Sequence, residues 1–162
     1  MGFLTAQKSQ SVVSSGMNEA TSSLQADGDV IARFDLVTDP TDPTMISCEF
    51  YIRLSQGREA IDSSSEKTII TYTNPLVSGV IMSDNLTGAS ITQAVGDGGT
   101  LIEFGERWKV EVDFDICAGI LGNNVYCGAC DKFRVDARPS QGSVLSLTRL
   151  IPPVNTEVLI LE

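Results

Sequence analysis

The chain has 162 residues, and its 21 acidic and 11 basic side chains give a net charge of −10. A surface this acidic repels phosphate backbones and anionic lipid, which argues against nucleic acids and membrane surfaces as partners. The absence of histidine removes the commonest general base and metal ligand and excludes Ser–His–Asp chemistry within the chain. The length is typical of a single domain with a sizeable core.

Residues 3 to 24 carry an apolar stripe with the three- and four-residue spacing of a helix. The stripe consists of Phe3, Ala6, Val13, Met17, Ala20 and Leu24, and the polar Gln10 interrupts it. It is narrower than the face that a globular core usually needs, and the rest of the chain reads as β structure. We therefore expect this face to pack against another copy of the chain. The alternative is an ordinary core helix that packs onto the chain's own sheet.

The sequence begins with Met1-Gly2 directly in front of the helical pattern, which is typical of a segment taken from a longer precursor. The printed residues show no secretory signal pattern. No run of residues approaches the roughly 20 apolar side chains that a helix needs to cross a bilayer.

From Val30 onward, apolar and polar residues alternate as in half-buried strands. The strongest runs cover residues 46–54 and 108–116, and turn-forming segments such as 39–43, 97–99 and 139–142 separate the strands. We predict a mainly β fold, an antiparallel, Ig-like β-sandwich of eight or nine strands over residues 28–162, preceded by a helical segment over residues 1–27. No comparable helix is expected after residue 28.

Both ends of the chain resemble the archaellins, the archaeal flagellins. The N-terminal likeness rests on residues 2–10, on 19–24 and on Gly28-Asp29-Val30. The C-terminal likeness rests on Phe133, the Leu145-Ser146-Leu147 run, Arg149 and Pro152-Pro153. The match is close over the first 30 residues and rests on the strand pattern between residues 40 and 130.

The resemblance implies a structural subunit of the extracellular archaellum filament, which serves swimming motility, and not an enzyme. In that family the N-terminal helices pack as a bundle along the filament axis, and the β domains form the outer sheath. The implied partners are further copies of the chain and sister archaellins, with no membrane contact in the assembled filament and no required cofactor. The alternative is a cell-surface binding module, such as an adhesive pilin or a surface-layer domain, that holds calcium or a glycan.

Four cysteines stand at positions 48, 117, 127 and 130. For an extracellular protein we favour a disulfide from Cys117 to Cys127 or Cys130, which closes a loop of about ten residues and contributes ~3 kcal/mol in the chain-entropy model. Cys48 is then a small buried apolar residue. Four reduced thiols and a metal site remain the alternatives, although a single C-x-x-C pair is weak for zinc.

Asn85 begins the sequon Asn85-Leu86-Thr87, which lies between turn signals. Archaellins are commonly glycosylated at such sequons, so the resemblance makes Asn85 a candidate N-glycosylation site.

Acidic residues in turns are candidate calcium ligands, because Ca²⁺ prefers oxygen ligands on flexible loops. The candidates are Asp39, Asp42 and Asp97, although Asp-Pro turns usually bond only their own backbone. Asp113 and Asp115 fall on one predicted strand face at a separation that a carboxylate hydrolase could use. A solvated strand face explains that pair more simply, and no enzyme activity is predicted.

Overall fold

The protein is described by a computed structural model over residues 24–55 and 59–162. The strands are β1 (Leu24–Ala26), β2 (Val30–Asp35), β3 (Thr44–Leu54), β4 (Ile61–Asp62), β5 (Thr68–Thr73), β6 (Ser78–Ser83), β7 (Leu86–Thr87), β8 (Ala89–Val95), β9 (Leu101–Ile102), β10 (Arg107–Asp113), β11 (Lys132–Pro139), β12 (Leu145–Leu150) and β13 (Val158–Leu161). The helix α2 (Phe114–Leu121) and the 3-10 turn η1 (Asn123–Val125) lie between β10 and β11. Among these residues, no helix has the length and apolar character that a bilayer span requires.

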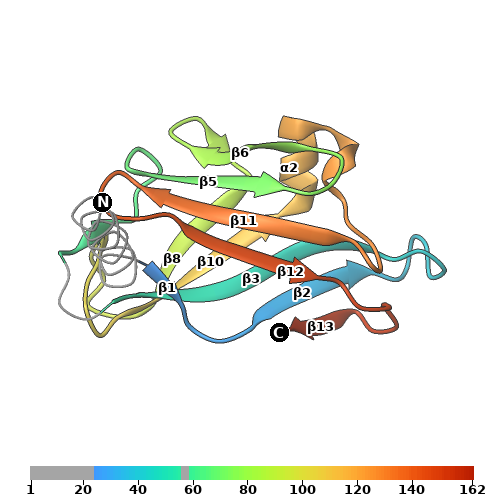
Figure 1. The fold of residues 1–162 in the computed structure, drawn as a ribbon, viewed down its shortest axis with the longest axis horizontal. Helices are drawn as coiled ribbons and strands as arrows, with labels where there is room; N and C mark the ends of the chain where they lie inside the picture. The colour runs from blue at the N-terminus through green and yellow to red at the C-terminus, as the bar shows by residue number, and fades with distance from the viewer. Residues whose placement is uncertain (1–23, 56–58) are drawn as a thin grey trace, which may run out of the picture.

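Two antiparallel sheets pack face to face and form a sandwich (Figure 1). The six-stranded sheet has the order β13-β2-β3-β10-β8, with β1 paired to β3, and the five-stranded sheet has the order β12-β11-β5-β6-β7. The mainly β, antiparallel sandwich predicted from the sequence is confirmed. The described residues form 13 strands rather than eight or nine, because short pairings such as β4 with β9 leave no alternating run long enough to detect.

The core lies between the inner faces of the two sheets, and the alternating runs supply it. Trp108, Val110 and Val112 of β10 are at most 3% exposed, and Phe50 and Ile52 of β3 are equally buried. Residues one position along each strand point to the opposite face, as the period of two requires. The two strongest runs of the sequence therefore form the middle of the six-stranded sheet.

Helix α2 is a departure from the sequence prediction, which continued the strand to Ile116. The strand ends at Asp113, whose side chain accepts a hydrogen bond from the Ile116 backbone N–H at 3.0 Å and so caps the helix. Gly122 ends the helix with a positive φ of 86°, a conformation that glycine adopts at little cost. The alternating pattern in the sequence continues past the end of the strand because Phe114, the first residue of the helix, is also buried. Ile116, which the pattern placed on the buried face, is 44% exposed.

Candidate assembly surfaces of the β domain

Leu24 is a strand residue and not the last residue of the predicted helix face. It opens β1, pairs with Leu54 of β3 and is 2% exposed. Burial in its own sheet leaves this side chain unavailable to a second molecule, so the prediction for Leu24 is wrong. The other five residues of the face, Phe3, Ala6, Val13, Met17 and Ala20, lie outside the described part of the chain. Because β1 belongs to the sandwich, the domain boundary predicted after residue 27 falls inside the sheet.

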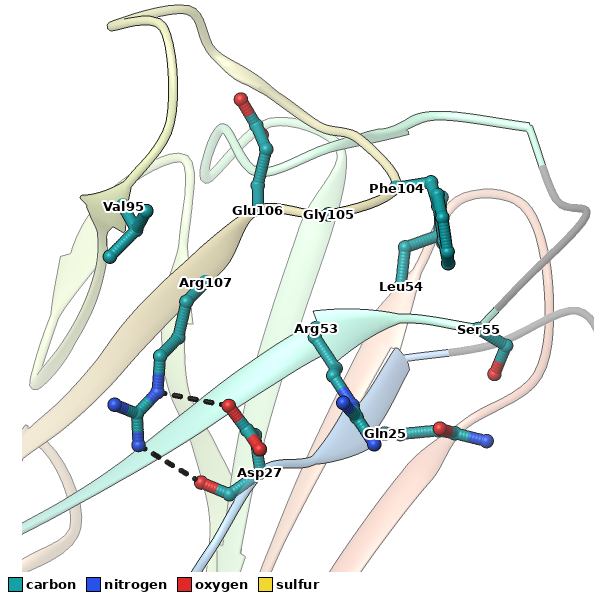
Figure 2. Close-up of a pocket in the computed structure, with 10 residues that line it drawn as sticks. All are labelled: Gln25, Asp27, Arg53, Leu54, Ser55, Val95, Phe104, Gly105, Glu106 and Arg107. Carbon is teal, nitrogen blue, oxygen red and sulfur yellow. Dashed lines mark hydrogen bonds and ion pairs between the residues drawn. The ribbon is translucent and has the colours of Figure 1, made fainter.

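A groove of about 700 Å³ opens beside β1 at one end of the sandwich (Figure 2). Its lining combines strand ends of β1, β3 and β8 with the loop before β10. Val95 and Phe104 line it and are 59% and 63% exposed, respectively. Large apolar side chains with this exposure, next to the first described strand, mark a candidate contact surface.

Arg107 fixes the chain beside this groove. Its Nε lies 2.9 Å from Asp27 Oδ2, in the turn after β1, and its guanidinium carbon lies 3.9 Å from the centre of the Tyr51 ring. The guanidinium therefore joins the turn after β1 to the outer face of β3 through an ion pair and a cation–π contact. No motif marks these three residues. Alternation places Arg107 and Tyr51 on a polar face, but only the pairing of β10 with β3 brings them together.

The candidate calcium ligands do not meet in one site. Asp39 and Asp42 lie in the loop between β2 and β3, whereas Asp97 follows β8 at the opposite end of the sandwich (Figure 1). Asp39 Oδ1 accepts hydrogen bonds from the backbone N–H groups of Thr41 and Asp42 and from the Thr41 hydroxyl, as an ordinary Asx turn does. The candidates therefore belong to two separate loops at opposite ends of β3, and calcium binding at either loop stays a prediction.

Asp97 instead lies near Glu103 and Glu106, with carboxylate oxygens within 4.8 Å of one another. Glu106 is only 8% exposed, and protein donors occupy both of its oxygens. The donors are Gln93 Nε2 at 2.8 Å and Asp97 N at 3.3 Å on one oxygen, and Trp108 Nε1 at 2.9 Å and Glu103 N at 3.0 Å on the other. The Glu106 carboxylate thus organises the loop between β8 and β10.

Removal of this carboxylate is expected to destabilise the domain. Glu106→Ala leaves the buried indole N–H of Trp108 without an acceptor, which costs about 2–3 kcal/mol of unfolding free energy at pH 7. Glu106→Gln keeps one acceptor oxygen and is the milder control. Urea unfolding monitored by tryptophan fluorescence measures both.

The same variants predict a pH dependence. Hydrogen bonds from Glu103 N and Trp108 Nε1 hold the pKa of Glu106 below its ordinary value. A carboxyl group with a lowered folded-state pKa stabilises the fold fully above its unfolded pKa of about 4.3, and that stabilisation is lost as the pH falls through the folded pKa. The difference in unfolding free energy between wild type and Glu106→Ala is expected to become smaller below pH ~4. A gap of constant size down to pH 3 would contradict this role.

All four cysteines are free in the structure, which differs from the predicted Cys117–Cys127 or Cys117–Cys130 disulfide. Helix α2 turns Cys117 into the core, where its Sγ donates to Gly88 O at 3.3 Å. Cys127 Sγ lies 2.9 Å from the Tyr72 hydroxyl, and Cys130 is exposed. Cys48 is buried as expected, with 1% exposure. Burial raises the pKa of Cys117 to about 12, so this thiol is neutral and unreactive at physiological pH.

Three further predicted positions have simple local surroundings. Asn85 is exposed in the two-residue turn of the β6–β7 hairpin, where Ser83 pairs with Leu86. Asp113 and Asp115 do not form a carboxylate pair on a strand, because Asp113 caps α2 and Asp115 accepts a hydrogen bond from the Tyr126 hydroxyl at 2.8 Å. Within the described ranges, Asp39, Asp97, Asp113, Asp115, Cys117 and Cys127 thus make contacts within the domain.

These features define a β-sandwich protein with a groove of mixed polar and apolar lining beside its first described strand. The model of the archaeal-type flagellin family matches residues 1–149, and the chain belongs to this family. It is 29% identical to "Probable flagellin 1" of Aeropyrum pernix, over 94% of this chain and 78% of the relative. It is 28% identical to "Probable flagellin 2" of Archaeoglobus fulgidus, over 97% of this chain and 79% of that relative. The family is one of structural filament proteins, and the chain is not an enzyme.

Solved structures agree with this assignment. The crystal structure of archaeal flagellin FlaB1 from Methanocaldococcus jannaschii has a TM-score of 0.67 to this chain at 13% identity, over 85% of this chain and 95% of that chain. That likeness shows the fold. A chain in the solved structure of the archaeal flagellum of Methanospirillum hungatei has a TM-score of 0.61 to this chain at 25% sequence identity, over 98% of this chain and 84% of that chain. The resemblance noted in the sequence is therefore confirmed at the level of family and fold.

Proposed function

We propose that the protein is a structural subunit of the archaellum filament, which lies outside the cell and serves swimming motility. The N-terminal helix of each copy packs against the helices of other copies, and the β domain lies on the outer surface. Further copies and sister archaellins are the partners. The match of the family model from residue 1 to residue 149 carries the proposal, because it includes the helical pattern as well as the sandwich.

The β domain has properties that suit an outer position. The net negative charge of the chain favours solubility in water. Most strands bury the side chains of one face in the core and expose those of the other face to solvent. The groove with Val95 and Phe104 lies beside β1, so it is suitably placed to meet the helical layer below the sandwich. Burial of apolar area contributes roughly 25 cal/mol per Å², which makes such contacts effective in a polymer.

The direct test is to find the protein in filaments. Filaments sheared from the native cells are expected to contain peptides of this chain by mass spectrometry, and gold-labelled antibodies against the β domain are expected to decorate them along their length. Deletion of the gene is expected to reduce swimming in soft agar, and the restored gene to recover it. Label confined to the cell envelope, with filaments free of the chain, would contradict the proposal and would favour a surface-binding module.

We also propose that Asn85 carries a glycan, because the sequon lies in an exposed hairpin turn. Asn85→Gln and Thr87→Ala both destroy the sequon, and each is expected to increase gel mobility of the protein isolated from its native cells. Asn123→Gln, at an exposed asparagine outside any sequon, is the control. Equal mobility of all four proteins would show that the site is unmodified.

A further inference from the structure

The outer face of the five-stranded sheet is basic, although the chain as a whole is acidic. Strand pairing places its residues in adjacent rows on β12, β11, β5 and β6. The positions are the cations Lys132, Arg134 and Arg138, the single acid Asp136, the hydroxyl residues Thr71, Thr73, Ser78, Ser146 and Thr148, and the apolar Ile69, Val80 and Leu150. We call this surface the basic face.

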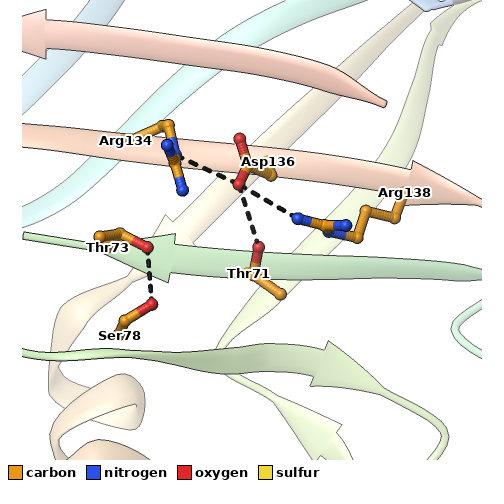
Figure 3. Close-up of polar contacts among 6 residues, drawn as sticks. All are labelled: Thr71, Thr73, Ser78, Arg134, Asp136 and Arg138. Carbon is orange, nitrogen blue, oxygen red and sulfur yellow. Dashed lines mark hydrogen bonds and ion pairs between the residues drawn. The ribbon is translucent and has the colours of Figure 1, made fainter. Parts of the chain in front are cut away.

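Asp136 stands in the middle of the basic face and is nearly sealed from solvent. Arg134 Nε lies 3.2 Å and Arg138 Nη2 3.7 Å from Asp136 Oδ2, which also accepts from Thr71 Oγ1 at 3.5 Å (Figure 3). The side chain is 4% exposed, and its other oxygen, Oδ1, is buried without a hydrogen-bond partner. One acid therefore offsets one of the three cations, and an acceptor on this face remains unpaired.

The opposite charge is concentrated at one end of the sandwich, in the loop 36–43 and at the residue before it. Asp35, Asp39 and Asp42 carry three negative charges there, and Val37 stands 86% exposed among them. Asp35 Oδ1 accepts from the N–H groups of Val37 and Thr38 at 2.8 and 3.0 Å, which holds the loop in a defined shape. We call this segment the acidic loop. Hydrogen bonds from the Thr38 and Thr41 side chains, and then from nearby backbone N–H groups, hold the pKa values of Asp35 and Asp39 below their ordinary range, so these two acids are firmly ionised.

We propose that the basic face binds the acidic loop of a second copy of the chain and so forms a lateral contact of the polymer. The inference rests on the proposed function, that the chain is a filament subunit. Two different patches of one surface make a heterologous contact, which is the kind that builds an open helical polymer. The exposed Val37 meets exposed apolar side chains such as Leu150. Charge complementarity sets the orientation of the two copies.

A charge exchange in the native filament tests the contact. Lys132→Glu with Thr148→Glu reverses the basic face and leaves both ion pairs of Asp136 in place, and like charge across the contact is expected to lower filament yield per cell at least tenfold. Val37→Lys, Thr38→Lys and Asp42→Lys together change the acidic loop from three negative charges to one net positive charge, and this variant is expected to act similarly. All five substitutions together restore attraction between opposite net charges and are expected to recover at least half of the wild-type yield. Arg33→Glu with Thr92→Glu makes the same total charge change on the exposed face of the other sheet and is expected to have little effect.

Cross-linking provides a second readout if a variant is poorly secreted. In a Cys130→Ser background, which removes the exposed native thiol, Val37→Cys with Thr148→Cys is expected to give a ladder of disulfide-linked oligomers from oxidised filaments, whereas Val37→Cys with Thr92→Cys is not. Filaments that contain the reversed protein at wild-type yield and show no ladder overturn the contact and leave the filament role intact. Wild-type filaments that lack the chain altogether overturn the filament role itself.

Discussion

Tyr72→Ala is expected to lower the free energy of unfolding by about 4 kcal/mol, near the middle of the range for loss of a buried aromatic ring. Tyr72 is fully buried on β5, and its ring meets Phe114 of α2 at 5.2 Å, edge to face, and Phe133 of β11 at 6.3 Å. Its hydroxyl donates to Val125 O at 2.9 Å. One side chain thus joins the five-stranded sheet to the helix and to the turn after it. Thermal or urea unfolding followed by circular dichroism measures the loss.

Tyr72→Phe is the matched control. It keeps the ring and removes only the hydroxyl, which donates to Val125 O and also lies 2.9 Å from Cys127 Sγ, so the expected cost is about 1–2 kcal/mol, the usual net value of one or two hydrogen bonds. Asn74 Nδ2 still approaches Val125 O at 3.4 Å and limits the penalty. If both variants lost the same stability, the ring contacts would contribute nothing and the hydroxyl everything, which would contradict the packing role.

The fold could be predicted because strand periodicity is written directly into the sequence. Residues 108 to 113 alternate in sequence and alternate between buried and partly exposed in the structure, so the pattern alone identified β10 and its inner face. Helix α2 escaped detection because it has only eight residues and because its first residue, Phe114, continues the strand pattern. The cue that was present is Asp113, an N-cap residue followed nine positions later by Gly122.

Local patterns could not supply the contacts that depend on tertiary pairing. The disulfide prediction assumed that Cys117 and Cys127 bracket a loop, whereas α2 buries Cys117 against Gly88, a residue far away in sequence. A Cβ atom added at Gly88 would lie 2.7 Å from Cys117 Sγ, so the glycine is needed for this close approach. The Arg107–Asp27 ion pair and the basic face likewise exist only once the order of strands is known.

The position of Leu24 changes how the N-terminal stripe is understood. If the predicted helix face had run to residue 24, the Leu24 side chain would have packed against helices of other copies. Because Leu24 is buried against β3, the predicted contact face between copies is reduced to Phe3, Ala6, Val13, Met17 and Ala20. The sequence pattern of residues 3 to 20, with its period near 3.5, remains a prediction of contact between copies.

Val13→Asp is therefore expected to abolish filament formation. Val13 lies at the centre of the predicted seam, between Ala6 and Ala20, and a carboxylate there would be buried between helices without a partner. Burial of an unpaired charge costs several kcal/mol, and this penalty recurs at every subunit of the polymer. The measurement is the number of filaments per cell by negative-stain electron microscopy, with the secreted and cell-associated protein quantified by immunoblot.

Ser15→Asp separates the effect of position from the effect of charge. On a helix, residue 15 lies about 200° from residue 13, on the face opposite the stripe, so the same carboxylate is expected to remain solvated and filaments to persist. Both variants retain the β domain, whose urea unfolding is expected to match that of the wild type. Filaments of normal number from Val13→Asp would mean that the stripe does not lie between molecules. Contact between copies would then depend on the sandwich surfaces alone.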